Sequence, residues 1–167
     1  MNFDTLLTQN SGAFVPMFDP PLTKSNSVSM DLSSSSREFS GLQEQELDQA
    51  ILHKLQAAGA IAGVGGYLEN RSLYRDTELF QGDAERCIHV GVDVFMPADT
   101  IINAPLAGTV QSFANRQVSG DYGPVIILRH DLDGFEFHTL YGHLSESSLD
   151  GLSIGQSFAA GGAVAQI

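Results

Sequence analysis

The 167-residue sequence has a single cysteine, no tryptophan, and only 8 basic side chains against 20 acidic ones. One cysteine, Cys87, cannot build an intrachain disulfide framework, so the cysteine content does not point to secretion. The formal net charge of -12 argues against nucleic acid and anionic membrane surfaces as partners. A hydrophobic content of 43% is ordinary, and the length suits one domain with a hydrophobic core.

Long apolar runs are also missing. No stretch approaches the length of a membrane span, so we expect no transmembrane segment. Residues 1–7 lack the basic start and the sustained apolar core of a signal peptide. The chain as written is therefore expected in the cytoplasm. The oligomeric state has no signature in the sequence.

Residues 1–59 are predicted to form an N-terminal arm followed by one helix. The first forty residues show no sustained period but contain many large apolar groups, which predicts an extended arm that packs on a body. A helix is predicted over about 41–58, because Ser40 with Gln43 resembles a capping box and Gly59 is a suitable stop. The apolar stripe of this helix would consist of Leu47, Ile51, Leu52 and Leu55.

Residues 60–167 have the pattern of a β-rich domain, in which glycines recur between short β-branched or alternating segments. Strands are predicted over 108–113, 125–128 and 136–141. Asp133-Gly134 marks a hairpin turn that joins residues 125–130 to residues 135–143. The predicted fold class is mainly β: an antiparallel sandwich or barrel-like domain preceded by the arm and the helix.

The residues with the most distinctive chemistry are His89 and Asp93, in His-Val-Gly-Val-Asp, and His143 about fifty residues later. Two imidazoles and a carboxylate suit a catalytic zinc site, which uses three protein ligands and leaves one position open. On a straight strand, residues four apart lie about 13 Å from each other, too far to share an ion. Val-Gly-Val is also a poor helix interior. A bend at Gly91 is therefore predicted to bring His89 and Asp93 together.

Further motifs accompany these residues in a fixed order, and they are Gly66-Tyr67 with Arg71, Arg86-x-x-His89-x-Gly91-x-Asp93, Pro97-Ala98, Ala104-Pro105-x-x-Gly108-x-Val110, Gly120-Asp-Tyr122-Gly123, Tyr141-Gly-His143-Leu144 and Gly151-x-x-x-Gly155-Gln156. Together they resemble the lysostaphin/LytM-type zinc metallopeptidases, a family of bacterial peptidoglycan endopeptidases. The resemblance covers residues 66–167. It implies a fold of the duplicated hybrid motif type, zinc (Zn2+) as cofactor, and a hydrolase that cleaves peptide bonds in peptidoglycan cross-links.

By this resemblance, His89 and Asp93 are zinc ligands and His143 is a catalytic histidine beside the metal. Arg71 and Tyr122 are candidates for orienting a peptide or peptidoglycan substrate. The family draws its third ligand and second catalytic histidine from a later His-x-His motif, whereas no histidine follows His143 here. We therefore expect a truncation before that motif and an inactive chain. Family members usually act in the periplasm or outside the cell.

The other histidines are expected to have structural or solvated positions. His53 is predicted on the exposed side of the helix, and His130 is predicted to be hydrogen-bonded at a strand end. His138 alternates out of phase with His143 along the predicted strand, so it should face the other way and not bind metal.

Three other functions fit part of the pattern. A non-catalytic binding or regulatory module of the same fold would explain the missing His-x-His, but not the three retained site residues. A biotinyl or lipoyl carrier needs a lysine in the β region, and the only lysines are Lys24 and Lys54. A phosphohistidine carrier of related fold has its active histidine after the Ala-Pro-x-x-Gly segment, whereas His89 precedes it.

Overall fold

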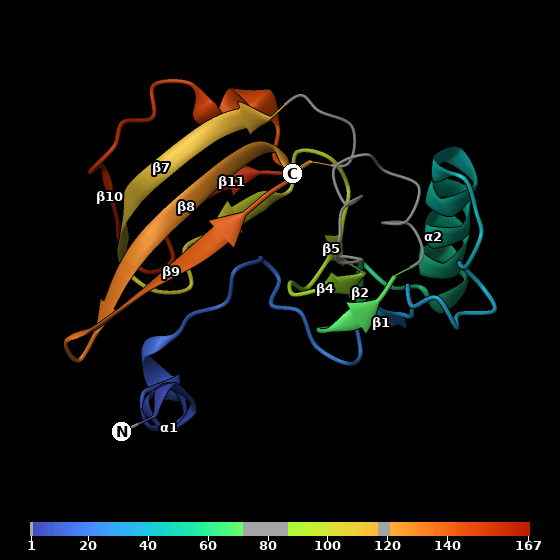
Figure 1. Cartoon of the computed structure of the whole chain (residues 1–167), viewed down its shortest axis with the longest axis horizontal. Helices are drawn as coiled ribbons and strands as arrows, with labels where there is room; N and C mark the ends of the chain where they lie inside the picture. The colour runs from blue at the N-terminus through green and yellow to red at the C-terminus, as the bar shows by residue number, and fades with distance from the viewer. Residues whose placement is uncertain (1, 72–86, 117–120) are drawn as a thin grey trace. The chain divides into compact units, whose positions relative to one another are not determined.

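The structure is a computed structural model that describes residues 2–71, 87–116 and 121–167 (Figure 1). It is mainly β, which confirms the fold class predicted from the sequence. The chain forms two compact units, one of residues 22–96 and the other of residues 1–21 with 97–167. None of the helices in the described ranges is long and apolar enough to cross a membrane.

The unit of residues 22–96 contains a three-stranded sheet in the order β1-β2-β5. β1 (Ser27–Met30) runs parallel to β2 (Ala62–Gly65), and β5 (Val94–Phe95) runs antiparallel to β2. Part of the predicted arm is therefore a strand of this sheet. A hairpin-like pair, β3 (Glu69–Asn70) and β4 (Ile88–His89), is antiparallel.

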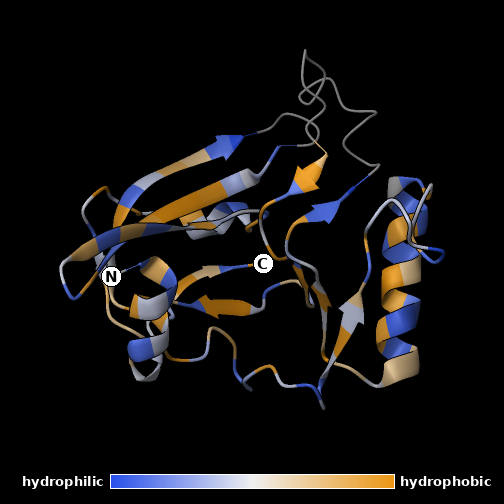
Figure 2. Ribbon diagram, turned by 60° about the horizontal axis from the view of Figure 1, so that its bottom comes forward, coloured by the Kyte–Doolittle hydropathy of each residue, from blue (hydrophilic) through white to orange (hydrophobic). Residues whose placement is uncertain are grey.

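The helix α2 (Glu44–Ala58) confirms the helix predicted from the sequence, with corrected details. Gly59 ends it in the left-handed conformation, at φ 59°, as expected of a glycine stop. The capping box lies one turn later than predicted, because the Glu46 carboxylate accepts a hydrogen bond from the Gln43 N–H at 3.0 Å. Figure 2 shows hydrophobic and hydrophilic residues mixed along α2, as in a helix with one buried side.

One residue of the predicted apolar stripe does not belong to it. Leu52 is 57% exposed, whereas Ile51 is buried. Leu47, Ile51 and Leu55 follow one another at four-residue steps, so Leu52 lies about 100° from the centre of their stripe. The buried core that the stripe covers consists of Met30, Leu32, Phe39 and Ile51.

The larger unit is organised by a four-stranded antiparallel sheet in the order β10-β7-β8-β9. Its strands are β10 (Ser157–Phe158), β7 (Gly108–Arg116), β8 (Gly123–Leu132) and β9 (Phe135–Tyr141). These elements confirm the predicted strands and hairpin. Asp133 and Gly134 both have positive φ, at 53° and 79°, as a two-residue hairpin turn requires.

Shorter elements also belong to this unit. β6 (Ile101–Asn103) pairs antiparallel with β11 (Ala163–Gln166). A 3-10 helix, Glu146–Leu149, separates β9 from β10, and another, Ser11–Ala13, follows the N-terminal helix.

The N-terminal helix α1 (Phe3–Gln9) was not predicted from the sequence, which favoured an extended arm. The side chain of Asn2 accepts a hydrogen bond from the Thr5 N–H at 2.8 Å and so caps α1. The Phe3 ring stacks on Phe135 with centroids 5.1 Å apart. A helix of seven residues is too short to show a sustained period, and its packing against β9 supplies the stability that its length does not.

Removing the side chain of Met30 should destabilise the unit that contains the candidate metal site. Met30 is 1% exposed within the core cluster, so Met30→Ala should lower the free energy of unfolding by about 2–4 kcal/mol. Leu52→Ala, on an exposed position of α2, should change it by less than about 0.5 kcal/mol. Urea unfolding followed by circular dichroism measures both, and equal losses would contradict this description of the core.

Candidate zinc site and catalytic residues

His89 and Asp93 lie close together, as predicted from the bend between them. β4 ends at His89, β5 begins at Val94, and the chain bends at Gly91 between these strands. His89 Nε2 lies 3.8 Å from Asp93 Oδ1. A straight strand would hold the two residues about 13 Å apart. The bend is therefore what brings the side chains of these two residues together.

Gly91 has a different role from the one predicted for it. The sequence suggested that it adopts unusual backbone angles, but Gly91 is not among the described residues with positive φ. A Cβ atom at this position would lie 3.1 Å from both Cε1 and Nε2 of His89. The absence of a side chain thus leaves room for the imidazole ring to turn toward Asp93.

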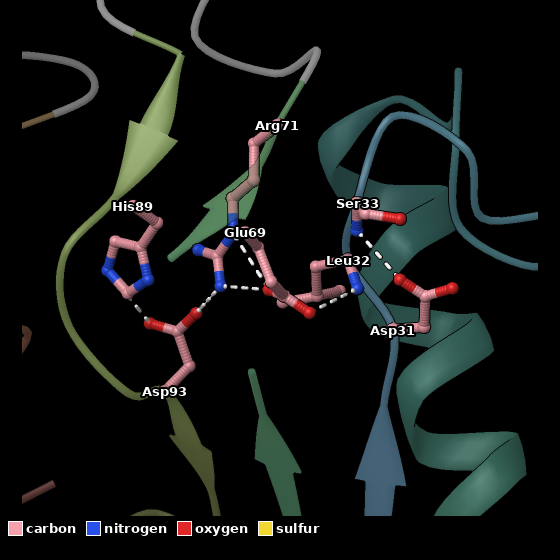
Figure 3. Close-up of polar contacts among 7 residues, drawn as sticks. All are labelled: Asp31, Leu32, Ser33, Glu69, Arg71, His89 and Asp93. Carbon is pink, nitrogen blue, oxygen red and sulfur yellow. Dashed lines mark hydrogen bonds and ion pairs between the residues drawn. The ribbon is translucent and has the colours of Figure 1, made fainter. Parts of the chain in front are cut away.

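The Asp93 carboxylate also contacts a buried arginine. Nη2 of Arg71 lies 2.5 Å from Asp93 Oδ2 and 2.7 Å from Glu69 Oε2, as Figure 3 shows. The Arg71 side chain is only 8% exposed. The two oxygens of Asp93 therefore have different partners, because Oδ1 faces His89 and Oδ2 faces Arg71.

Glu69 was not identified from the sequence. It lies opposite His89 in the β3–β4 pair, and its Oε2 accepts hydrogen bonds from Nε and Nη2 of Arg71 at 3.2 and 2.7 Å. Its other oxygen, Oε1, accepts a hydrogen bond from the Leu32 N–H at 3.2 Å. The only signal in the sequence is that Glu69 and Arg71 are two residues apart, which places them on one face of an extended segment.

The donor atoms of His89 and Asp93 fit two ligands of a zinc ion. Tetrahedral zinc with bonds of about 2.0–2.1 Å holds its donor atoms about 3.4 Å apart, close to the observed 3.8 Å. An imidazole nitrogen and a carboxylate oxygen are both common zinc donors. Within the described ranges, no group of three or more His, Cys, Asp or Glu side chains could hold a metal ion. Binding of zinc by these two residues thus stays a prediction.

His143 and Tyr122, predicted from separate motifs, are neighbours in the other unit. His143 follows the end of β9 and has φ 56°, which is uncommon for a residue other than glycine. Its N–H donates to the Tyr122 carbonyl at 2.7 Å, and the two ring centroids are 6.3 Å apart. Both side chains are exposed, so both are accessible to a substrate.

The glycine between Tyr141 and His143 makes this contact possible. A Cβ atom on Gly142 would lie 2.9 Å from Cδ1 of Tyr122. The left-handed turn at His143 also means that the alternation of β9 cannot be continued from His138 to His143. His138 is exposed, but the predicted comparison of its direction with that of His143 does not apply.

The remaining histidines have the positions expected of them. His53 is exposed on α2. His130 is 1% exposed and hydrogen-bonded through both ring nitrogens, as predicted, although it lies within β8 and not at its end. Its Nδ1 donates to the Ala107 carbonyl at 2.9 Å, and its Nε2 lies 2.7 Å from the Thr139 hydroxyl.

The hydroxyl of Thr139 also lies 3.1 Å from that of Tyr141, which extends this buried polar network. Burial raises the pKa of Tyr141 above its ordinary value, and the hydrogen bond from Thr139 opposes this increase to a smaller extent. The network thus stabilises the sheet that precedes His143.

The predicted site residues therefore form two local groups. His89, Asp93 and Arg71 belong to residues 22–96, and Tyr122 and His143 belong to the other unit. Arg86 and Gly120, which belong to the quoted motifs, lie outside the described residues.

The chain is mainly β, and an imidazole and a carboxylate approach each other at a bend. Residues 87–167 match the model of Peptidase family M23, which confirms the resemblance to the LytM/lysostaphin type. The match supports a peptidase-type function for residues 87–167. The match includes His89, Asp93, Tyr122 and His143, but not Arg71. Comparison with curated proteins and with solved structures gives no match.

Adding a methyl group at Gly91 should disturb the candidate metal site more than the fold. The Cβ atom of Gly91→Ala would lie 3.1 Å from the His89 ring and should turn it away from Asp93. We expect zinc affinity, measured by competition with a chelating dye, to fall about tenfold. The control is Gly12→Ala, where a Cβ atom meets nothing within 4 Å. An unchanged affinity in Gly91→Ala would show that the imidazole does not depend on this space.

Proposed function

We propose that this chain carries a zinc-dependent metalloendopeptidase domain that hydrolyses peptide bonds, with peptidoglycan cross-links as its substrate class. The observation that supports the proposal most directly is the 3.8 Å approach of His89 Nε2 to Asp93 Oδ1, inside the segment that matches Peptidase family M23. Two donors of the types that zinc prefers face each other there.

In this proposal, His89 and Asp93 hold the metal through Nε2 and Oδ1. Zinc held by these residues would supply a Lewis acid for the scissile carbonyl and would lower the pKa of a bound water molecule toward neutrality. By the family resemblance, His143, whose imidazole is exposed, would be the catalytic histidine that takes up and releases a proton. Tyr122, beside His143, would orient the substrate with its ring and hydroxyl.

The proposal includes weak zinc binding and negligible turnover by these 167 residues alone. They supply two of the three ligands that the family resemblance implies, because no His-x-His occurs in them. Two ligands leave the ion largely hydrated and more easily lost than in a three-ligand site. A non-catalytic binding module of the same fold is the second candidate, favoured by the lack of a three-donor group in the described ranges.

Substitution of the two proposed ligands should abolish zinc binding. His89→Ala and Asp93→Asn each remove one of two donors, so calorimetric titration of either variant with zinc should give no measurable heat of binding. His138→Ala is the matched control, since His138 is an exposed histidine on β9 and should leave the titration unchanged. Equal losses in all three variants would undo the assignment.

Activity distinguishes the two candidate functions further. The 167-residue protein should not cleave purified peptidoglycan or a cross-bridge peptide at a measurable rate in the presence of zinc. Robust zinc-dependent cleavage would mean that a ligand has been misassigned. Failure of the wild-type protein to bind zinc at all would favour the non-catalytic module.

A further inference from the structure

We propose that Glu69 and Arg71 are positioning residues that fix the Asp93 carboxylate, so that Oδ2 is engaged and Oδ1 alone is presented toward His89. This inference rests on the proposed zinc site, but it assigns a role to residues outside the M23 match. It also gives Arg71 a different role from the substrate contact predicted from the sequence, which stays untested.

The first argument is the burial and sharing of the Arg71 charge. Its guanidinium is 8% exposed and lies between two carboxylates, at 2.5 Å from Asp93 Oδ2 and 2.7 Å from Glu69 Oε2. The contact with Glu69 is a hydrogen bond and the contact with Asp93 is an ion pair, and the attraction between such charges is strengthened where water is excluded. Asp93 Oδ2 is therefore held in place, and a metal bound by this carboxylate would be bound through Oδ1.

The second argument is that Glu69 is itself fixed at both oxygens. Oε2 accepts from Arg71 while Oε1 accepts from the Leu32 N–H at 3.2 Å, as Figure 3 shows. A Cβ atom on Gly66 would lie 2.9 Å from Oε1, so this glycine leaves the space that the carboxylate occupies. Glu69 is thus bound to the segment that follows β1. Its hydrogen bonds with Arg71 in turn restrict the position of the guanidinium.

The backbone before Glu69 supports the same interpretation. Leu68 has φ 60°, a left-handed conformation that costs of order 1 kcal/mol or more for a residue with a branched side chain. Such strain persists only where the surroundings determine the conformation. Here the β3–β4 pairing places Glu69 opposite His89, so one pair of strands carries both a proposed ligand and the positioning carboxylate.

The balance of two carboxylates on one guanidinium explains why Glu69 matters for the metal. Without its charge, Arg71 would be free to form a two-pronged contact with both oxygens of Asp93, since the guanidinium fork matches a carboxylate. That contact would draw Oδ1 away from His89. Removing one negative charge beside the site would also weaken attraction for a dication.

The test is Glu69→Gln, which keeps the shape of the side chain and an oxygen that can accept from Leu32. We expect zinc to bind about 10–100-fold more weakly, as measured by competition with a chelating dye. The matched control is Glu136→Gln, which makes the same change in an exposed ion pair with Arg129, at 3.7 Å. Wild-type affinity in Glu69→Gln would overturn the proposal.

A second variant covers the case in which Glu69→Gln fails to fold. Gly66→Ala keeps the Glu69 charge but places a Cβ atom 2.9 Å from its Oε1, so the carboxylate must move. Zinc affinity should fall here too. An unchanged affinity, with the Glu69 carboxylate displaced in a crystal structure of the variant, would overturn the proposal.

A metal-free measurement separates this inference from the proposed function. In a crystal structure of zinc-free Glu69→Gln, Arg71 should contact both oxygens of Asp93, and the distance from His89 Nε2 to Asp93 Oδ1 should exceed 3.8 Å. An unmoved Arg71–Asp93 contact would refute positioning, whether or not the protein binds zinc. Absence of zinc binding by the wild-type protein would instead refute the proposed function.

Discussion

The candidate metal site depends on the ion pairs that the buried Arg71 guanidinium forms with Asp93 and Glu69. An unpaired cation taken out of water costs several kcal/mol, so the fold must supply carboxylates around it. Asp93 and Glu69 do so, and each uses its second oxygen elsewhere: Asp93 toward His89, and Glu69 toward the backbone of Leu32. One cation thereby links the bend, the β3–β4 pair and the segment after β1.

The backbone between His89 and Asp93 decides whether their side chains can approach each other. An imidazole and a carboxylate four residues apart would be separated along a strand and would not share an ion. Here β4 ends before Gly91 and β5 begins after it. As a result, His89 Nε2 lies 3.8 Å from Asp93 Oδ1. Gly91 contributes free space beside the imidazole instead of an unusual backbone angle.

Local signals predicted much of this molecule, while long-range contacts explain what was missed. The Asp133-Gly134 turn, the strands beside it and the Gly59 stop depend on neighbouring residues, so the sequence alone was sufficient. The parallel pairing of β1 with β2 joins segments over thirty residues apart, and nothing local specifies it. Glu69 was missed for the same reason, because its role comes from the distant Leu32 as well as from Arg71. The helix α1 was too short to produce a period.

Tyr122 and His143 belong to motifs that are about twenty residues apart in the sequence, yet they are in contact in the structure. His143 would not adopt φ 56° without compensation, and two backbone hydrogen bonds supply it, from His143 to Tyr122 at 2.7 Å and from Leu144 to Pro124 at 3.2 Å. Gly142 has no side chain and so leaves space for the Tyr122 ring. The imidazole of His143 is exposed. An exposed histidine with a left-handed backbone is therefore held in place by its backbone contacts with the segment of Tyr122 and Pro124.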